Sequence, residues 1–484
     1  MSLQCSLSDS AGSRNRRIRA GWLLARRAGL MRGGCLVVCD GRIVGIEKKA
    51  DGPIDLDLED SIVLPGLING HTHLEFSGLE SPLPTTGGFV AWLRRVIDFR
   101  RERWGDFSSE VQWELRRQDL LCGLKESWQC GTVAIADIAT SPYPIGEGLV
   151  EAFHQTPGES VSLIALGEVL GWTEQRRREM QLAYEKMAME AKSNSDSGAV
   201  GTKHSTLHQH LEQAALDQQG NSLPESTAFP VNRPSWESLV RQKNSQYDWG
   251  VSPHAPYSTS PRLIQWCIER SRREQRLLAM HLGETLEEME WLARRSGMFG
   301  ELLERLGVGP VPLMSQWGSC REYLIHLSRA WRALVVHANY LSAEDWEVLV
   351  KNRGHMSVVY CPRTHRYFGH DRYPLAAMRQ AGVRVLVGTD SRASNPDLSV
   401  WEELKTIAAG ESGLSPADIL DLGTLEAAAG LGIDSQMGAI ELGRTSRVAV
   451  AKFIGLASGT KDSRWLWERL WDPTEVVAPV TLCL

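Results

Sequence analysis

The most restrictive feature of the chain is the segment Leu64–His73 (LPGLINGHTH), where two histidines follow an apolar run that Pro65 and Gly66 interrupt. On an extended backbone, residues i and i+2 point to the same face, so His71 and His73 are expected to project together from a strand end. Two imidazoles placed in this way suit one metal ion. For an isolated His-x-His, the alternative is a pair used only for hydrogen bonding.

The middle of the chain alternates apolar, strand-like runs with amphipathic helical stretches, which predicts a parallel α/β fold. At 484 residues, a (β/α)8 TIM-type barrel with a small appendage uses most of the length. Five of the eight runs end on His or Asp, where a barrel holds its active site. The runs are Ile62–His73, Thr132–Ile138, Ser160–Val169, Trp249–His254, Leu277–His281, Ala333–His337, Met356–Cys361 and Val383–Asp390.

Both ends of the chain are rich in strand-like sequence. Cys35–Ile46 reads as a hairpin with Asp40-Gly41 as its turn, and Val448–Phe453 is again strand-like. We therefore expect a small composite β domain made of residues 18–64 and 438–484, around a barrel of residues 65–437. Residues 1–17 are expected to be a flexible tail.

One stretch, residues 192–245, breaks the alternation. It is rich in Ser, Gln, Asn and Gly, and it contains His204, His208 and His210. Metal binding by these three histidines is one interpretation, but the composition favours a solvated polar insertion.

Composition excludes several functional classes. The net charge is −6, with no long Lys/Arg block, which argues against nucleic acid as a partner. No apolar run reaches the roughly 18 residues that span a bilayer, and the polar, basic N-terminus does not resemble a secretory signal. Nine dispersed cysteines without a Cys-x-x-Cys pair favour free thiols and a cytoplasmic location.

Further strand ends carry chemically useful residues. His281 closes an apolar run and Glu284 follows in the next loop, where it could carry a proton or simply begin a helix. His337 and Asp390 close two later runs, and His254 lies between two prolines that fix the local backbone. Each residue alone is a weak signal. The ordered set on successive strand ends is a strong one.

This ordered set resembles the amidohydrolase superfamily, specifically its cytosine deaminase/chlorohydrolase-like branch. The motifs that carry the resemblance are Pro65–His73 (PGLINGHTH), Ser252–Tyr257 (SPHAPY), His281–Glu284 (HLGE), His337–Asn339 (HAN) and Gly388–Asp390 (GTD). The branch includes S-adenosylhomocysteine, guanine and aminodeoxyfutalosine deaminases. The closer similarity is to aminodeoxyfutalosine deaminase-like proteins, through His71–Ser77, Cys361–His370 and Ser391–Asn395.

The resemblance implies a role for each matching residue. His71, His73, His281 and Asp390 match metal ligands, Glu284 matches the proton shuttle, His337 matches the residue that steers water or substrate, and His254 matches a substrate contact. Binuclear relatives use a carboxylated Lys at a mid-barrel strand end. Ser160–Val169 and Trp249–His254 contain no Lys, so one divalent ion is expected: zinc, with Fe²⁺ as the alternative.

The implied reaction is hydrolytic deamination of an amino-substituted heteroaromatic ring, a purine nucleoside-like molecule such as aminodeoxyfutalosine or S-adenosylhomocysteine. The alternatives are a chlorohydrolase or other C–N hydrolase of the guanine or triazine type, and a metal-binding scaffold without turnover. The expected partners are a small-molecule substrate and water, and a homo-oligomer is compatible with the sequence.

Three further residues are candidates for the substrate pocket. Arg363 and Arg392 lie beside strand ends and could bind a distal carboxylate of the substrate, or could simply be exposed. His365 stands where many relatives have Asn, and a pocket role and a structural role are equally compatible with its position.

The composition of the insertion leads to a prediction. Replacing residues 194–232 by a short Gly/Ser linker should leave folding and turnover largely intact. A polar loop buries little apolar area, and a shorter loop reduces the entropic cost of loop closure. Circular dichroism, metal content and turnover of the deletion variant would test this. An unfolded or metal-free variant would show that the segment is a structural element.

Overall fold

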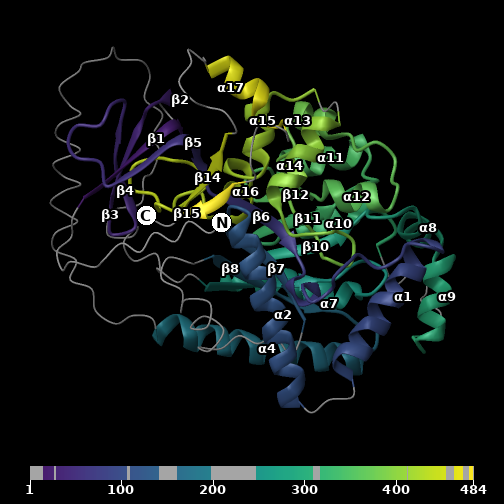
Figure 1. The fold of residues 1–484 in the computed structure, drawn as a ribbon. Helices are drawn as coiled ribbons and strands as arrows, with labels where there is room; N and C mark the ends of the chain where they lie inside the picture. Colours follow the sequence, from purple (N-terminus) through teal and green to yellow (C-terminus); the bar gives the residue numbers. More distant parts are fainter. Residues whose placement is uncertain are drawn as a thin grey trace.

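The computed structural model describes residues 15–26, 29–105, 109–140, 161–197, 247–308, 317–410, 413–453, 463–472 and 479–482. Two sheets organise these residues, an eight-stranded parallel sheet and a seven-stranded mixed sheet. Figure 1 shows the purple N-terminal strands together with the yellow C-terminal strands on one side, and the barrel with its helices on the other. The predicted fold class, a TIM-type barrel with a composite β domain, is confirmed.

The barrel strands follow one another in sequence order, and every pair is parallel. Each of the eight predicted runs overlaps one of them. The strands are β6 (Leu67–Thr72), β7 (Thr132–Ala139), β8 (Ser162–Val169), β9 (Tyr247–Pro253), β10 (Leu277–Leu282), β11 (Arg332–His337), β12 (Met356–Tyr360) and β13 (Val385–Val387).

The first predicted run was wrong as a single strand. Its apolar part, Ile62 to Leu64, belongs to β5 (Leu56–Pro65) of the mixed sheet, and only β6 enters the barrel. The break falls at Gly66, where an added Cβ would lie 2.4 Å from Val133 Cγ1. The chain can therefore pass from one sheet to the other only with glycine at this position.

The barrel is completed where β6 meets β13. The carbonyl of His71 accepts hydrogen bonds from the amides of Thr389 (3.0 Å) and Asp390 (3.1 Å). The hydroxyl of Thr72 donates to the backbone carbonyl of Asp390 at 2.7 Å, and the side-chain amide of Asn69 donates to the hydroxyl of Thr389 at 2.7 Å. The two strands that close the barrel are thus joined beside the residues predicted to bind the metal.

Strand alternation determines which residues face the barrel interior. In β10, Leu277 and Ala279 pack in a cluster drawn from strands around the barrel, whereas Leu278 and Met280 pack in the larger cluster that includes the surrounding helices. His281 continues the Leu277–Ala279 face, so the period of two places its ring at the interior end of the strand.

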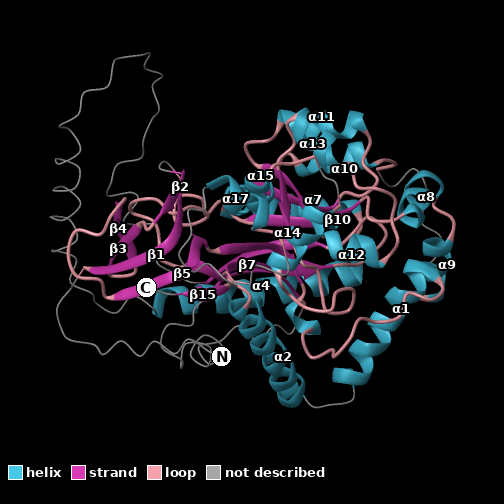
Figure 2. Cartoon of the chain, turned by 45° about the horizontal axis from the view of Figure 1, so that its top comes forward, coloured by secondary structure: helices cyan, strands magenta, loops and turns pink. Residues whose placement is uncertain are grey.

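Helices surround the barrel, as the cyan elements of Figure 2 show. Several begin with ordinary capping chemistry; for example, the Ser342 hydroxyl accepts from the amide of Asp345. The helices are α1 (Gly88–Arg100), α2 (Ser109–Gln129), α4 (Glu174–Ser197), α7 (Pro261–Glu274), α8 (Leu286–Arg294), α9 (Met298–Arg305), α10 (Cys320–Leu327), α11 (Ala343–Lys351), α12 (Pro362–Tyr367), α13 (Leu375–Ala381), α14 (Val400–Ala409), α15 (Pro416–Leu422), α16 (Leu425–Leu431) and α17 (Ser463–Arg469), with the short turns η1 (Leu74–Phe76) and η2 (Arg101–Gly105).

The mixed sheet joins the two ends of the chain. Its order is β15-β14-β5-β1-β3-β4, with β2 paired to β1. The predicted hairpin is present, and Asp40 and Gly41 both have positive φ, as its two-residue turn requires. The strands are β1 (Arg16–Ala25), β2 (Gly29–Arg32), β3 (Cys35–Cys39), β4 (Arg42–Glu47), β14 (Val448–Lys452) and β15 (Val480–Leu482).

Two predicted segments lie largely outside the described residues. The tail was expected to run to residue 17, but β1 already begins at Arg16 and pairs with β3 and β5. Of the insertion expected at 192–245, only residues 192–197 are described, and they continue α4. In the part of the chain that the structure describes, none of the helices combines the length and apolarity needed to cross a bilayer.

Candidate active site

Three histidines from two strands converge at one end of the barrel. His71 and His73 come from the end of β6, and His281 comes from β10, on the far side of the barrel mouth. One ligand atom of each ring lies within 4.8 Å of the others. The ring centroids of His71 lie 4.9 Å from those of both His73 and His281. Three buried imidazoles in this arrangement can bind one ion.

The free nitrogens of these rings fit a metal ion. Three of these ring nitrogens are buried: both nitrogens of His71 and the Nδ1 of His73. Among the described residues, none of the three has a hydrogen-bond partner. His281 Nδ1 lies 2.9 Å from the His254 carbonyl oxygen, so Nδ1–H donates there and Nε2 remains available as a ligand. Burial lowers the pKa of His73 and His281, which favours the neutral imidazole that binds metals.

Asp390 adds a carboxylate to the same site. Its Oδ1 lies 3.7 Å from Nε2 of both His71 and His73, and its Oδ2 accepts a hydrogen bond from the Ser394 hydroxyl at 2.8 Å. Burial opposes ionisation, but the neighbouring imidazoles of His71 and His337 outweigh it and hold the pKa of Asp390 below its usual range. The backbone φ of Asp390 is +55°, a strained conformation typical of functional sites.

Glu284 and His337 form a buried pair beside this site. His337 Nε2 lies 3.3 Å from Glu284 Oε1. Burial and the nearby carboxylates of Asp390 and Glu288 raise the pKa of Glu284 well above its usual value, which favours a protonated acid. The backbone amide of Glu284 donates to the Glu288 carboxylate at 2.9 Å, so its loop is fixed.

His254 lies at the end of β9, as the sequence predicts. Its Nδ1 is 2.6 Å from the Ser258 hydroxyl, and its ring centroid is 5.1 Å from that of His281. Burial and the nearby Arg100 lower the pKa of His254, so the ring is neutral and can both donate and accept a hydrogen bond. The structure thus places six of the seven sequence-predicted residues around one cavity, and the ring of the seventh, His71, lies against the rings of His73 and His281.

Glu168 is a site residue that the sequence reasoning missed. It is buried near the end of β8 and lines the same cavity. Within the described chain its Oε1 has no hydrogen-bond partner, and it lies 4.0 Å from His254 Nε2. Burial raises the pKa of Glu168 to about 7. Its position was the available signal, because it is an acidic residue at the C-terminal end of a predicted barrel strand.

The cavity at the histidines is small and partly apolar. Its volume is about 50 Å³, which holds only a few water molecules. Helix α1 forms much of its cover and begins directly after Gly87, whose φ is +91°. The apolar lining residues are Phe76, Phe89, Trp92, Leu93, Val96 and Tyr257.

The three further candidates for the substrate pocket have other partners. Arg363 forms a two-pronged ion pair with Asp397 at 2.6 and 2.8 Å, and Arg392 pairs with Glu126 at 3.0 Å. His365 Nδ1 contacts the side chain of Asn339, which in turn donates to the Glu284 carbonyl. His365 therefore has a structural role that supports the Glu284 loop. The insertion histidines His204, His208 and His210 lie outside the described residues.

Known proteins match this chain over most of its length. The model of the amidohydrolase family matches residues 62–452. The 5-methylthioadenosine/S-adenosylhomocysteine deaminase of Desulforudis audaxviator is 30% identical over 434 residues, covering 86% of this chain and 80% of that protein.

Two solved structures share the fold. The aminofutalosine deaminase of Helicobacter pylori superimposes with a TM-score of 0.67 at 18% identity, covering 96% of this chain and 98% of the other. The atrazine chlorohydrolase of Arthrobacter aurescens, crystallised with zinc, has a TM-score of 0.62 at 18% identity, covering 93% and 90%.

The convergence of the histidines predicts the metal content. The purified protein should hold about one divalent ion per chain, and His71→Ala should retain little, because a site that loses one of its few ligands binds far more weakly. Elemental analysis would measure this, with His326→Ala as the control. The His326 ring stacks on Trp317 and is not one of the clustered histidines. About two ions per chain, or none after supplementation, would contradict the mononuclear site.

Proposed function

Because the chain belongs to the amidohydrolase family, we propose that it is a metal-dependent hydrolase that removes the amino group from an adenine-type nucleoside. One observation supports this proposal most directly. A cluster of histidines that can bind a metal ion lies beside the carboxylate of Asp390 and the buried acid Glu284. Zinc is the ion that we propose for His71, His73, His281 and Asp390, with Fe²⁺ as the alternative.

The attacking water is the first requirement of the reaction. A bound divalent ion supplies an activated water, because it lowers the pKa of water from 15.7 toward about 7. Asp390 lies against His71 and His73, so its carboxylate can accept the proton of that water and orient it. The Ser394 hydroxyl holds the other carboxylate oxygen and fixes this orientation.

The leaving amino group is the second requirement. An amine on an aromatic ring carbon leaves poorly until a ring nitrogen is protonated. Glu284 is suited to this task because burial favours its protonated form, and a positioned general acid typically contributes about 10²–10⁴ in rate. His337, 3.3 Å from Glu284, can orient the acid and contact the attacking water.

The residues that line the cavity can bind the aromatic ring of the substrate. The neutral ring of His254 can hydrogen-bond a purine nitrogen, and the aromatic side chains of Phe89, Trp92 and Tyr257 offer apolar surface to a planar base. A nucleoside exceeds a cavity of about 50 Å³, so substrate binding needs more room than this cavity offers.

Glu284→Gln separates chemistry from metal binding. The substitution removes the transferable proton but keeps the size of the side chain, so kcat should fall by about 10²–10⁴ while metal content persists. Glu287→Gln is the matched control, since Glu287 is a partly exposed neighbour on α8. A Glu284→Gln enzyme within a few-fold of the parent would show that Glu284 does not carry the proton.

A substrate panel tests the reaction itself. We expect the zinc-loaded protein to release ammonia from aminodeoxyfutalosine, S-adenosylhomocysteine or adenosine with a higher kcat/KM than from guanine. If kcat/KM for guanine or a chlorotriazine exceeded that for the nucleosides by tenfold or more, about 1.4 kcal/mol of transition-state preference, the nucleoside proposal would fail. Chloride release without ammonia would assign the protein to the chlorohydrolases, and no release from any compound would favour a scaffold.

A further inference from the structure

A chain of hydrogen bonds leads from α12 to Glu284, the acid of the proposed reaction. The Nδ1 of His365 lies 3.1 Å from Asn339 Oδ1, and Asn339 Nδ2 donates to the backbone carbonyl of Glu284 at 2.9 Å. We call these three groups the relay. The backbone amide of Glu284 is held separately by the Glu288 carboxylate. The peptide groups on both sides of Glu284 are thus fixed, one by Glu288 and the other by the relay.

The second ring nitrogen of His365 determines what the first can do. His365 Nε2 lies 2.7 Å from the backbone carbonyl oxygen of Asp371. A carbonyl oxygen only accepts, so Nε2 must bear a hydrogen. In a neutral imidazole, Nδ1 then has a lone pair and no hydrogen, and it faces Asn339 Oδ1, which also only accepts. All bonds of the relay can therefore form only when the ring of His365 is protonated.

Rotation of the Asn339 amide does not remove this conflict. With its nitrogen and oxygen exchanged, the amide can donate to Nδ1 of a neutral His365. Its oxygen then faces the carbonyl oxygen of Glu284, and the bond to Glu284 is lost. Asn339 can therefore satisfy a neutral His365 or Glu284, but not both. Protonation of His365 commits Asn339 to Glu284.

The same segment also holds His337, the partner of Glu284. The hydroxyl of Tyr373 donates to the backbone carbonyl of His337 at 3.1 Å, and the ring of Tyr373 lies edge-on to that of His365. His337 and Ala338 have φ of +68° and +55°, a strained backbone that persists only where its surroundings fix it. Residues 365–373 therefore support both members of the acid pair.

The groups around His365 decide when its ring is protonated. His370 and Tyr373 lie on the same segment, Tyr360 faces the ring from β12, and Asp371 adds a carboxylate. Burial lowers the pKa of His370 to about 4 and raises the pKa values of both tyrosines, so these three side chains are uncharged near neutral pH. Burial lowers the pKa of His365 as well, and the carbonyl and carboxylate of Asp371 partly offset this.

The charges that the neighbouring helix α14 brings to α12 have other partners. Glu403 on α14 accepts from the backbone amide of Arg363 at 2.8 Å, and the side chain of Arg363 pairs with Asp397. The protonation of His365 is thus set mainly by burial and by Asp371. Since the pKa is lowered, the ring is neutral at neutral pH and gains a proton as the pH falls. The relay is complete at low pH and loses one bond as the pH rises.

We propose that His365 is a positioning residue for Glu284, and that it fixes the Glu284 backbone through Asn339 only when its ring is protonated. The inference rests on the proposed deaminase function, in which Glu284 transfers a proton to the substrate. It assigns to His365 a pH-dependent role beyond simple support of the loop.

Two substitutions at position 365 test the proposal. His365→Asn supplies an amide donor at every pH, whereas His365→Leu supplies none. For the adenine nucleoside with the highest kcat/KM, the ratio of kcat between parent and His365→Leu should rise about three- to tenfold from about pH 8 to about pH 5, the range of one hydrogen bond. The ratio between His365→Asn and His365→Leu should not change with pH. KM and metal content should be similar in all three proteins.

Ratios are used because titration of Glu284 and of the metal-bound water is common to all the proteins and cancels. If His365→Leu does not fold, the parent compared directly with His365→Asn should show the same rise. His355→Asn is the matched control. His355 directly precedes β12, at the other end of that strand, with its Nε2 2.9 Å from the Ser328 carbonyl oxygen, so its ratio to the parent should be independent of pH.

Protonation of His365 can also be observed directly. In the zinc-loaded protein with ¹⁵N-labelled histidine, the His365 signals are those that disappear in His365→Asn. Both of its ring nitrogens should show the shifts of a protonated imidazolium at low pH, and Nδ1 should lose its hydrogen as the pH rises.

The outcomes separate this inference from the proposed function. A ratio of parent to His365→Leu that does not vary with pH, or a His365 ring that stays neutral down to about pH 5, would overturn the relay and leave the deaminase function standing. The same pH dependence in His355→Asn would assign the effect to general titration and would also overturn the relay. If no adenine nucleoside releases ammonia, the function and the inference both fail.

Discussion

The hydrogen bonds between β6 and the residues that directly follow β13 both close the barrel and bring the metal-site residues together. The carbonyl of His71 accepts from the amides of Thr389 and Asp390, so the same contacts that join the first strand to the last bring a ligand histidine beside the carboxylate. The remaining histidines then need only the parallel arrangement of β10 and β11, which places His281 and His337 at the same end. Disturbing this contact would therefore disturb fold and chemistry together.

Much of this arrangement could be predicted from the sequence, because strand ends are marked by their own residues. An apolar run followed by His or Asp identifies both a strand and its position at the barrel mouth. For this reason six of the seven predicted residues line one cavity, and the seventh, His71, belongs to the histidine cluster there. The error at Ile62–Leu64 has a physical reason. An apolar run does not reveal which of two sheets it joins, and the exclusion of a side chain at Gly66 depends on Val133, 67 positions later in the chain.

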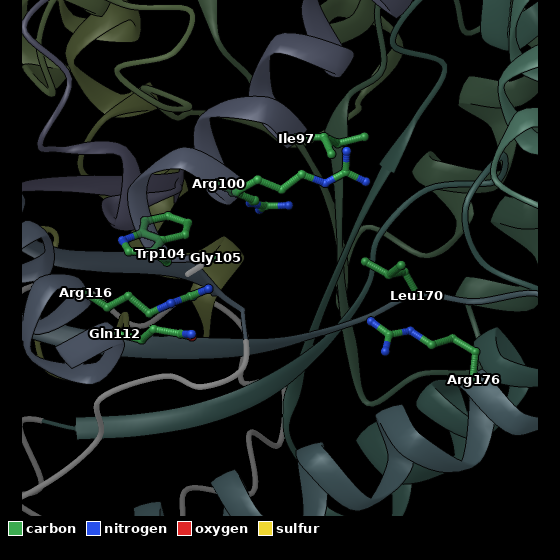
Figure 3. Close-up of a pocket in the computed structure, with 9 residues that line it drawn as sticks. Ile97, Arg100, Trp104, Gly105, Gln112, Arg116, Leu170 and Arg176 are labelled. Atoms are coloured by element: carbon green, nitrogen blue, oxygen red, sulfur yellow. The ribbon is translucent and has the colours of Figure 1, made fainter. Parts of the chain in front are cut away.

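Other features depend on contacts between distant segments and could not be predicted. Glu168 lies at a predicted strand end, but its role depends on His254 and Arg100, which only the folded chain brings beside it. Arg363 and Arg392 looked available at their strand ends, but Asp397 and Glu126 bind them. Arg100, Arg101, Arg116 and Arg176 come from α1, η2, α2 and α4, and they line one cavity of about 360 Å³ only when these elements pack (Figure 3).

The composite sheet can be completed only late in the synthesis of the chain on the ribosome. Strand β5 pairs with β1 on one side and with β14 on the other, and β14 begins at Val448, 383 residues after β5 ends at Pro65. At about 5–20 residues per second, a ribosome needs roughly 20–80 s to supply that partner. Throughout this interval the edge of β5 is open to pairing with other chains, which is a hazard of unpaired strands. The barrel can fold in the meantime, so the first sheet to be started is the last to be finished.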